Sequence, residues 1–478
     1  MQESYHISDI KTEVLQLFNA DQAWEYRLVP YEQTKERVIF YSDTDQYTHI
    51  DELELLFAKE IMLSNVGEAT LQMLLTKYYR KTESSINKGA TKQKYTGSSN
   101  DFLRSLIGES KALKSSDIHI EIYDERCRVR LRIDGMLIER YILEKSEYPA
   151  IINKLKIMAN LDIAEKRLPQ DGRIFFNQDG QKFDIRVSVL PTLHGEKVVL
   201  RLLSNDATNI DIYKLGFSEF DLSNYLEGVR KPHGIILISG PTGSGKTTTL
   251  YATLKLLNKE SRNIVTIEDP IEYTLEGINQ VQLKESIGLN FGSALRTFLR
   301  QDPDIIMVGE IRDYDTASMA IRASLTGHLV LSTIHTNSAW GTVSRLIDMG
   351  VPPFLVANTL NVSIAQRLVR LLCKKCRTQE PFNPSLYPKQ YRAARTLTHH
   401  FVAKGCEDCF HTGYRGRKAV YEVVPIDKDL GDAIKKNLNT VEHLYQERGI
   451  GTLSDNAFTL FERGETTIEE IYSLLLNF

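Results

Sequence analysis

The amino-acid sequence predicts an α/β protein in which a large domain with a mostly parallel sheet follows an α+β domain and a small N-terminal domain. From about Asn209 the apolar runs are continuous and alternate with helical segments, which is typical of a sheet covered by helices on both faces. Between Phe102 and about Asn205, apolar and polar residues alternate at period two, which indicates a partly antiparallel sheet. The polar segment before Phe102 is rich in Gly, Ser and Lys and is typical of a linker. The predicted parts are the N-terminal domain 1–82, the linker 83–101, the α+β domain 102–207 and the last domain 208–478, with a cysteine-rich insert at 373–409.

Each part has its own local pattern. In the N-terminal domain, "RVIFYS" at 37–42 predicts a strand, and "LQMLLTKYYRK" from Leu71 predicts a helix. The α+β domain is expected to hold strands in "DIHIEIYD", "CRVRLRIDG", "DIRVSVLPT" and "KVVLRLL", a helix near "YPAIINKLKIMANL" and a turn at Asp134-Gly135. Cys127, in one of these strands, is expected to be a small apolar filler. The last domain is expected to hold buried strands in "GIILISG", "NIVTIED", "DIIMVGE" and "GHLVLSTIH". After about Val369, the cysteine-rich insert and then helical periodicity are expected to reach Phe478.

Composition narrows the class of protein. The chain has 478 residues, 42% of them hydrophobic and 25% charged, which is ordinary for a soluble protein of two to four domains. Its formal net charge of −3 gives no basic footprint for nucleic acid. We expect no signal peptide and no membrane-spanning helix, because the sequence has neither a basic start before an apolar run nor about 18 consecutive apolar residues. Five cysteines make no disulfide scaffold, so we expect a cytosolic protein with reduced thiols.

A glycine-rich stretch, "GPTGSGKT", lies between an apolar strand and a helix-like run and matches the P-loop (Walker A) pattern. Glycines let backbone N–H groups surround phosphate oxygens, and the following helix adds its positive N-terminal end. We expect Lys246 to reach the β- and γ-phosphates and Thr247 to ligate Mg²⁺. The alternative is a strand-to-helix turn that binds no nucleotide. The predicted nucleotide-binding residues are Gly240, Pro241, Thr242, Gly243, Ser244, Gly245, Lys246, Thr247 and Thr248.

Two acidic clusters and a histidine pair follow the predicted strands. Glu310 ends "DIIMVGE", where a carboxylate can hold Mg²⁺ directly or through water. Glu268, Asp269 and Glu272 lie in "IEDPIE", and one cluster could serve the metal while the other acts on water. The alternative for the second cluster is a solvated loop. His328 and His335 bracket the strand in "TGHLVLSTIHTN"; polar residues there can sense the γ-phosphate, although a buried histidine can also be structural.

Four cysteines form two C-x₂-C pairs, "LCKKC" and "GCEDC". Two such pairs can wrap one tetrahedral ion with four thiolates, and four ligands leave no open position, so a zinc ion there would be structural. A redox pair or coincidence are the alternatives. The predicted zinc ligands are Cys373, Cys376, Cys406 and Cys409.

Together and in this order, these motifs resemble the secretion ATPases of type II secretion and type IV pilus assembly. That family has a P-loop, an Asp box of the form EDP-x-E, a Gly-Glu Walker B strand and a two-histidine His box. The α+β domain adds the similar stretches "SSDIHIE", "RLPQDGR" and "RVSVLPTLHGEKVVLRLL", so the resemblance spans roughly Phe102 to the C-terminus. It implies a RecA-like P-loop ATPase domain preceded by a PAS-like N2 domain. The four motifs lie at Gly240–Thr247, Glu268–Glu272, Asp304–Asp313 and Gly327–Asn337.

The resemblance also implies roles for single residues. Glu272 matches the glutamate considered catalytic, and Glu310 matches the Walker B glutamate that acts, with Thr247, at Mg²⁺ and its water. Arg186 and Arg201 match arginines that the N2 domain presents to the nucleotide during catalysis, and surface ion pairing is the alternative. The residues expected to sense phosphate are His328, His335, Arg296 and Arg300.

Members of the family are hexameric rings that do mechanical work on an inner-membrane assembly. The resemblance therefore implies ATP, Mg²⁺ and structural Zn²⁺, a homo-hexamer, and a cytoplasmic protein attached peripherally to the inner membrane through platform proteins. The tetracysteine insert and the extra N-terminal domain favour assembly or secretion over pilus retraction. "WEYRLVPYEQTKERVIFYSDTD" loosely resembles the platform-docking N1 domain and lacks the RLG-x₂-L repeat of relatives that bind cyclic di-GMP. The alternatives are a RecA-like nucleic-acid translocase and a nucleotide-gated scaffold. The net charge leads us to expect no nucleic-acid partner.

Overall fold

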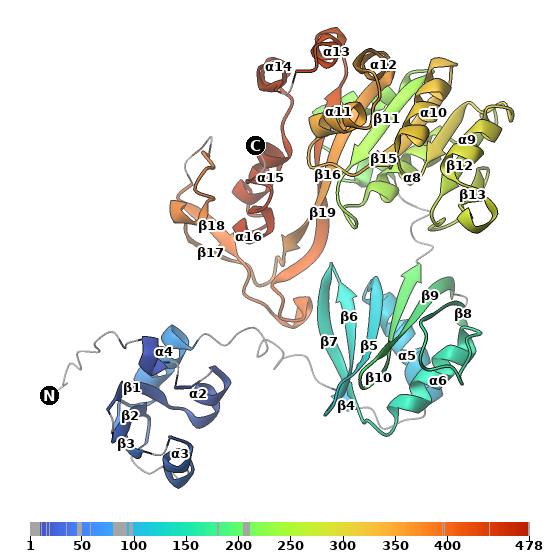
Figure 1. Cartoon of the computed structure of the whole chain (residues 1–478). Coiled ribbons are helices and arrows are strands. Elements are labelled where there is room, and N and C mark those ends of the chain that lie inside the picture. The colour runs from blue at the N-terminus through green and yellow to red at the C-terminus, as the bar shows by residue number, and fades with distance from the viewer. Residues whose placement is uncertain are drawn as a thin grey trace. The chain divides into compact units, whose positions relative to one another are not determined.

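A computed structural model of the chain divides into two compact units, Met1–Gly89 and Ala90–Phe478 (Figure 1). The structure describes residues 10, 12–15, 17–18, 20–34, 36–44, 50–57, 59–79, 93–94, 99–178, 181–203, 211–393, 395, 397–438 and 440–476. Most of the predicted linker, and the predicted boundary near 207, lie outside these residues. The last linker residues do not form a loop, because helix α5 (Ser99–Ala112) begins among them.

The N-terminal unit is a three-stranded sheet with helices. β1 (Val29–Gln33) pairs antiparallel with β2 (Arg37–Ser42), and β2 pairs parallel with β3 (Glu60–Asn65). The predicted strand and helix are both present, as β2 and as α4 (Glu68–Tyr78). Apolar side chains such as those of Phe40 and Leu71 are fully buried in its core. The remaining helices are α1 (Thr12–Leu15), α2 (Ala20–Tyr26) and α3 (Ile50–Phe57).

The α+β domain holds a seven-stranded sheet of order β4-β7-β6-β5-β10-β9-β8, antiparallel except where β4 meets β7. In β6, residues alternate between buried and partly buried, as the period-two pattern predicts, and Asp134 and Gly135 both have the left-handed backbone of the predicted turn. Cys127 is fully buried. The strands are β4 (Gln93–Lys94), β5 (Asp117–Ile122), β6 (Cys127–Ile133), β7 (Met136–Leu143), β8 (Gln170–Gln178), β9 (Gln181–Thr192) and β10 (Gly195–Leu203), with helix α6 (Tyr148–Met158).

A buried carboxylate, Glu121, organises one face of this sheet. Its side chain is 3% exposed and contacts Arg130 at 2.7 Å, Arg128 at 2.9 Å and Lys197 at 3.1 Å. Burial opposes its charge, but the hydrogen bonds from Arg130, Lys197 and Arg128 outweigh burial and lower the pKa of Glu121 to about 2. The ionised carboxylate therefore neutralises a cluster of cations on β6 and β10.

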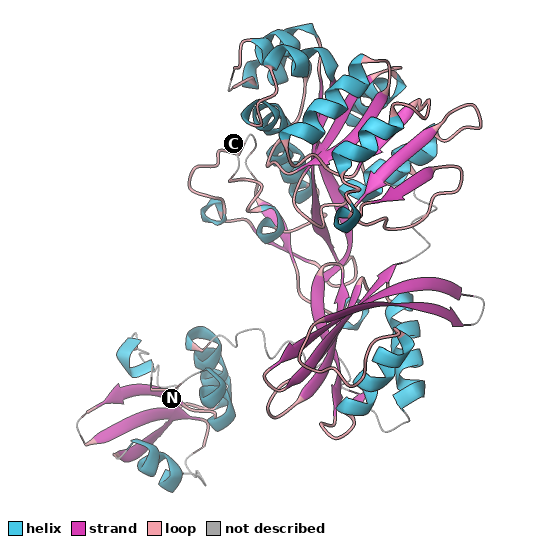
Figure 2. Cartoon of the chain, turned by 45° about the vertical axis from the view of Figure 1, so that its right-hand side comes forward, coloured by secondary structure: helices cyan, strands magenta, loops and turns pink. Residues whose placement is uncertain are grey.

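The last domain is built on a second seven-stranded sheet, of order β13-β12-β14-β15-β11-β16-β19. Its strand pairs are parallel except β16 with β19. Figure 2 shows helices flanking its strands. In β11, Ile235 and Leu237 enter one apolar core, and Ile236 and Ile238 enter the other, which explains the continuous apolar run. The predicted strands are β11 (Gly234–Ser239), β12 (Ile264–Glu268), β14 (Ile305–Val308) and β15 (Leu329–Ile334), and β13 (Asn279–Gln282) lies at the edge.

Helices fill the connections of this domain and cover its sheet. Among them are α7 (Glu219–Arg230), α8 (Lys246–Leu257), α9 (Phe291–Phe298), α10 (Tyr314–Leu325), α11 (Ala339–Asp348) and α12 (Pro353–Thr359). Within the described part of the chain, every helix is too short or too polar to cross a membrane.

The C-terminal part differs from the expected course. Instead of passing from the insert directly into helices, the chain forms β19 (Tyr414–Pro425), which pairs along β16 (Leu360–Leu372). The second half of β19 is buried on both faces, so its apolar residues belong to the sheet. The expectation of helix was therefore wrong for this segment. Two short strands, β17 (Thr378–Pro381) and β18 (His399–Val402), lie within the insert, and the helices that follow β19 are α13 (Lys428–Lys435), α14 (Glu442–Arg448), α15 (Leu453–Glu462) and α16 (Ile468–Ile471).

Candidate active site and metal centre

The loops that carry the predicted chemistry leave the sheet at one edge. Ser239, the last residue of β11, lies beside Ile334 of β15, and Val308 of β14 lies beside Ser332 of β15. Because these strands are parallel, the loops that follow them emerge on the same side of the domain, where open α/β sheets bind ligands. The P-loop, the Asp box, Glu310 and His335 all follow such strand ends.

The P-loop has the backbone that its glycines permit. Gly240, Gly243 and Gly245 have φ angles of 149°, 81° and 88°. A β-carbon on Gly240 would lie 2.5 Å from the carbonyl oxygen of Gln366, and one on Gly245 would lie 2.9 Å from the Gln366 side chain. The loop therefore packs directly against β16 and tolerates no side chain at these two positions.

Polar groups of the loop fit an anionic ligand. The Nζ atom of Lys246 donates to the carbonyl oxygens of Gly240 at 2.7 Å and Pro241 at 3.1 Å, so the ammonium lies over the loop. Burial lowers the pKa of Lys246, and the nearby carboxylate of Glu310 opposes this shift. The Ser244 hydroxyl is buried and has no hydrogen-bond partner among the described residues. A cradle of this kind, with a cation and an unsatisfied donor at a helix N-terminus, suits phosphate oxygens.

Glu310 lies directly beyond β14 and faces three cationic or titratable side chains. Its side chain is 17% exposed; one oxygen, Oε1, accepts a hydrogen bond from Arg312, and the other, Oε2, lies 3.4 Å from Nε2 of His335. This carboxylate also lies close enough to Lys246 of the P-loop for the two charges to interact. The structure thus brings together Glu310, Lys246 and His335, three of the residues that the motifs singled out.

Glu272 lies in the loop after β12, next to an arginine of the α+β domain. Nη1 of Arg186 is 3.5 Å from a carboxylate oxygen of Glu272, and Nη2 of Arg186 donates to the carbonyl oxygen of Ile271 at 2.6 Å. Arg201 pairs with Asp117 at 2.9 Å and also lies in the field of Glu272. Two arginines from β9 and β10 therefore approach the Asp box.

The side chain of Glu268, in the same Asp box, lies in the interior of the domain. It accepts hydrogen bonds from Tyr251, from Thr266 at 2.6 Å and from Gln280 at 3.0 Å. With both oxygens satisfied in the interior, Glu268 holds the loop together and faces no substrate. Only Asp269 and Glu272 of the predicted acidic cluster reach the surface.

His328 and the two arginines of α9 lie elsewhere. His328 precedes β15 at the end where Leu329 pairs with Gly234, the first residue of β11. At about 3.3 Å per residue, the six residues of β15 separate this end from the P-loop edge by about 20 Å. Nδ1 of His328 lies 2.8 Å from the carbonyl oxygen of Ala323. Arg296 and Arg300 are exposed in and after the last turn of α9, and Arg300 donates to the Arg296 carbonyl oxygen at 3.0 Å.

The residues behind the P-loop belong to no sequence motif. Gln366 of β16 accepts a hydrogen bond from Thr249 at 2.9 Å, and Arg367 donates to the carbonyl oxygen of Asn337 at 3.0 Å. Both support the loop from a strand that the sequence analysis did not identify. No local signal marks them, because their importance depends on the pairing of β16 beside β11.

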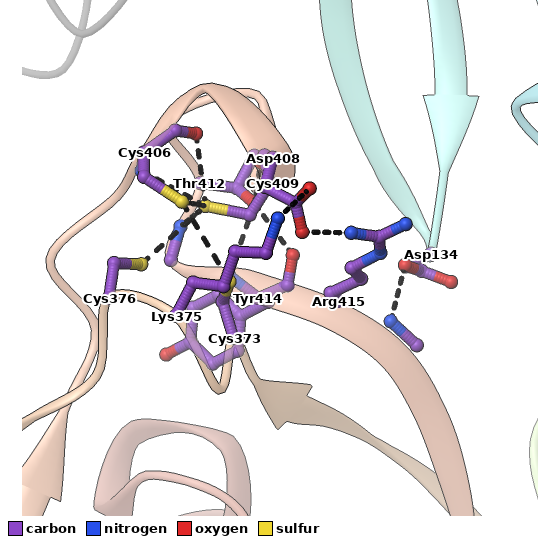
Figure 3. Close-up of polar contacts among 12 residues, drawn as sticks. Asp134, Cys373, Lys375, Cys376, Cys406, Asp408, Cys409, Thr412, Tyr414 and Arg415 are labelled. Atoms are coloured by element: carbon purple, nitrogen blue, oxygen red, sulfur yellow. Dashed lines mark hydrogen bonds and ion pairs between the residues drawn. The ribbon is translucent and has the colours of Figure 1, made fainter.

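The four cysteines of the insert converge on one point (Figure 3). All four sulfur atoms lie within 4.8 Å of one another. The Sγ–Sγ distances are 3.9 Å between Cys373 and Cys406, and 3.7 Å from Cys409 to Cys376 and to Cys406. Zn–S bonds of about 2.3 Å in a tetrahedron place sulfur atoms about 3.8 Å apart. The distances therefore fit one zinc ion, and they exceed the roughly 2.05 Å of a disulfide.

Groups around the cysteines support the same arrangement. The backbone N–H groups of Cys406 and Gly413 point at the Cys409 sulfur at 3.1 and 3.3 Å, as they do around metal-bound thiolates. Asp408 pairs with Lys375 at 2.8 Å and with Arg415 (Figure 3). The pair between Asp408 and Lys375 joins the two C-x₂-C loops from outside. The donor set is soft and complete, which suits a structural ion.

Comparison with known proteins gives one consistent result. The sequence signature of the family described as "Type II/IV secretion system protein" matches residues 92–473. The "Type IV pilus assembly ATPase PilB" of Myxococcus xanthus is 40% identical over 97% of this chain and 87% of its own length. The "Type II secretion system protein E" of Pseudomonas aeruginosa is 48% identical over 77% of this chain and 74% of its own.

Solved structures show the same fold. The ATPase DotB of Legionella pneumophila aligns over 80% of this chain and 97% of its own, with a TM-score of 0.60 and 21% identity. The pilus retraction motor PilT, in a structure with bound ADP, aligns over 77% of this chain and 95% of its own, with a TM-score of 0.53 and 26% identity.

Proposed function

The chain belongs to the type II/IV secretion system protein family, and from this premise we propose that it is an ATPase motor that drives assembly of a type II secretion pseudopilus or a type IV pilus. The observation that carries the proposal is the meeting of Lys246, Glu310 and His335 at the P-loop edge of the sheet. The relatives named for type II secretion and for pilus assembly match at comparable identity, so both systems remain in the proposal.

The residues at the P-loop edge divide the work of hydrolysis. The loop amides and Lys246 bind the phosphates of ATP. Thr247 and Glu310 are the residues that would hold Mg²⁺, which would supply positive charge to neutralise the phosphates. Glu272 orients the attacking water and accepts its proton, since its carboxylate is partly exposed and is held by Arg186. His335 contacts the second oxygen of Glu310 and can report the state of the γ-phosphate to it.

The arginines of the α+β domain act at the other side of the nucleotide. Arg186 and Arg201 supply cations that stabilise charge in phosphoryl transfer. Two contacts support this role: Arg186 pairs with Glu272 of the Asp box, and Arg201, paired with Asp117, lies in the field of Glu272. His328, Arg296 and Arg300 do not reach the P-loop edge of their own chain, so a phosphate-sensing role for them requires a nucleotide held by another subunit.

Other parts of the chain have supporting roles in this proposal. The zinc ion held by four thiolates is structural and stabilises the insert between β16 and β19. The motor works as a homo-hexamer, and its N-terminal domain docks on a platform protein of the inner membrane, which keeps a cytoplasmic protein peripherally attached. These last features rest on the resemblance of the motifs to the family.

Two other activities use the same fold. A RecA-like nucleic-acid translocase would need a basic surface, which the net charge of −3 does not favour. A pilus-retraction ATPase is favoured by the fold of PilT but not by the tetracysteine insert and the N-terminal unit. Assembly therefore remains the better proposal.

An ATPase assay on the purified full-length chain tests the proposal. We expect Mg²⁺-dependent phosphate release by the wild type that rises when the cognate membrane-platform protein is added. Glu310→Gln and Glu272→Gln should each lower kcat by about 100-fold or more and leave ATP binding measurable, because each removes a carboxylate that acts in the transition state.

His328→Gln is a matched control, because it alters a motif residue at the opposite edge of the sheet. The variant should bind ATP like the wild type in the monomeric protein, and a lower kcat in the hexamer would support phosphate sensing across a subunit contact. Turnover that DNA stimulates and the platform protein does not would contradict the assembly motor, and an inert wild type that binds no nucleotide would contradict the ATPase.

A further inference from the structure

Arg312 lies two residues after Glu310 in a loop that is fixed at both ends. The N–H of Ile311 donates to the carbonyl oxygen of Thr333 at 2.9 Å, and the Ile311 side chain is 3% exposed. Asp313 caps α10 by accepting the N–H of Thr316 at 2.8 Å. The backbone at Arg312 therefore has little freedom, and the direction of its side chain is set by the fold.

The guanidinium of Arg312 lies between its own loop and the Asp-box loop, in the electrostatic field of a third loop. It donates to Oε1 of Glu310, and the same nitrogen, Nη2, lies 3.9 Å from Oδ2 of Asp269 in the Asp box. The carboxylate of Glu285, which precedes α9, adds to the negative field around it. These three acids follow three different strands, β14, β12 and β13, at the edge of the sheet that carries the P-loop.

This contact is more than a pair between two solvated groups. Arg312 is 56% exposed, but Glu310 is only 17% exposed and has its other oxygen beside His335. Glu310, Arg312 and His335 line one cavity of about 310 Å³. The carboxylates of Glu310 and Asp269 both face one nitrogen, Nη2, of a rigid planar group, whereas a lysine ammonium would be a strongly hydrated point charge on a flexible stem.

We propose that Arg312 is a positioning residue for ATP hydrolysis, which ties the loop of Glu310 to the Asp-box loop of Glu272. The proposal rests on the proposed ATPase activity. By donating to Oε1 of Glu310 and attracting Oδ2 of Asp269 across 3.9 Å, the guanidinium favours one separation of the two loops. Because Glu272 is three residues after Asp269, this separation also sets the distance between the two glutamates that act on metal and water.

Steady-state ATP hydrolysis by the full-length chain, together with binding of a fluorescent ATP analogue, tests the proposal. We expect Arg312→Gln to lower kcat by about 10- to 100-fold, the loss that a misplacement of about 1 Å can cause. The dissociation constant of the analogue should change by less than about threefold, since among the described residues no hydrogen bond or ion pair joins Arg312 to the P-loop. Arg312→Lys should regain only a small part of kcat. The melting temperature of each variant shows whether it folds.

A double-mutant cycle with Asp269→Asn tests the link between the loops. If Arg312 acts by holding Asp269, then Asp269→Asn lowers kcat, and the double variant is no slower than Arg312→Gln alone. If the losses of kcat in the two single variants multiply in the double variant, the proposed link between the two loops is wrong. Full kcat in Arg312→Lys would also overturn the link, because it would show that charge alone is sufficient.

Arg345 offers the matched control, because it lines the same cavity but forms no ion pair among the described residues. Arg345→Gln removes the same charge and should leave kcat within about twofold of the wild type. An equal loss in both variants would overturn the specific role of Arg312. If the wild type hydrolyses no ATP, the proposed function fails; if the wild type is active and Arg312→Gln keeps its kcat, only the positioning role fails.

Discussion

The tetracysteine cluster makes the most direct prediction, which is that Cys409→Ser removes a structural zinc ion and loosens the insert. The Cys409 side chain is buried, and its sulfur accepts two backbone N–H groups, at 3.1 and 3.3 Å. Serine replaces a thiolate that zinc prefers with a hydroxyl that it binds poorly. Three remaining ligands would hold the ion more weakly and leave one position open to water.

The size of the effect follows from the loop that the ion closes. Cys373 and Cys406 are 33 positions apart in the chain. Closing a loop of this length restricts the open chain by about 4 kcal/mol in the chain-entropy treatment of cross-links. This energy corresponds to an increase of up to about a thousandfold in the population of the opened insert. The strands of the sheet are held by their own buried apolar residues, so we expect local opening of the insert and not complete unfolding.

Two measurements report the loss of zinc and the opening of the insert in Cys409→Ser. Metal analysis should find about one zinc per wild-type chain after purification without chelator, and less than about 0.2 in Cys409→Ser. Limited proteolysis should cleave the variant inside 373–413 much faster than the wild type. Cys127→Ala is the matched control, since Cys127 is buried in the α+β domain far from the cluster in sequence, and it should keep its zinc. A wild type without zinc, or a Cys409→Ser variant that keeps it, would refute the assignment.

Two further predictions concern the α+β domain. Glu121→Gln should destabilise the chain by about 3 kcal/mol at pH 7. The pKa of Glu121 is about 2 in the folded state and 4.5 in the unfolded chain, so the ionised carboxylate stabilises the folded state above pH 4.5. This stability is lost as the pH falls towards 2. Urea unfolding at pH 7 and at pH 3 measures the free energy of unfolding of the wild type and the variant. An equal loss of stability at both pH values would contradict the ionic cause. Arg186→Gln should lower kcat for ATP by about tenfold or more, through its contact with Glu272, with little change in the melting temperature. A kcat equal to that of the wild type would remove Arg186 from the site.

Local patterns predicted the parts of the fold that depend on neighbouring residues. The strands before the P-loop, the Asp box and Glu310 are short, continuous apolar runs, and burial on both faces requires such runs. The P-loop glycines were recognisable because their backbone angles exclude other residues. β19 was missed because its first half is polar and its pairing with β16 is a long-range contact that periodicity does not report.

The candidate site shows the same limit of local sequence patterns. The motifs name Glu268 and His328, but a motif cannot say which way a side chain points or at which end of a strand it lies. Glu268 turns into the interior, and His328 precedes its strand. The position of His328 could have been foreseen, because ligands of parallel sheets bind beyond the carboxyl ends of the strands. Gln366 carries no such signal, since only its contact with Thr249 reveals it.

The contact between Arg186 and the Asp box suggests how hydrolysis is coupled to movement. Arg186 belongs to β9 of the α+β domain, whereas Glu272 and Ile271 belong to the ATPase domain. A conformational change can be driven only by contacts that differ between two states. If the arginine leaves Glu272 when the α+β domain shifts, the carboxylate that we propose to act on water would lose its cation, and hydrolysis would slow until the contact returns. By linkage, a nucleotide state that strengthens this contact would also favour the position of the α+β domain in which the contact forms.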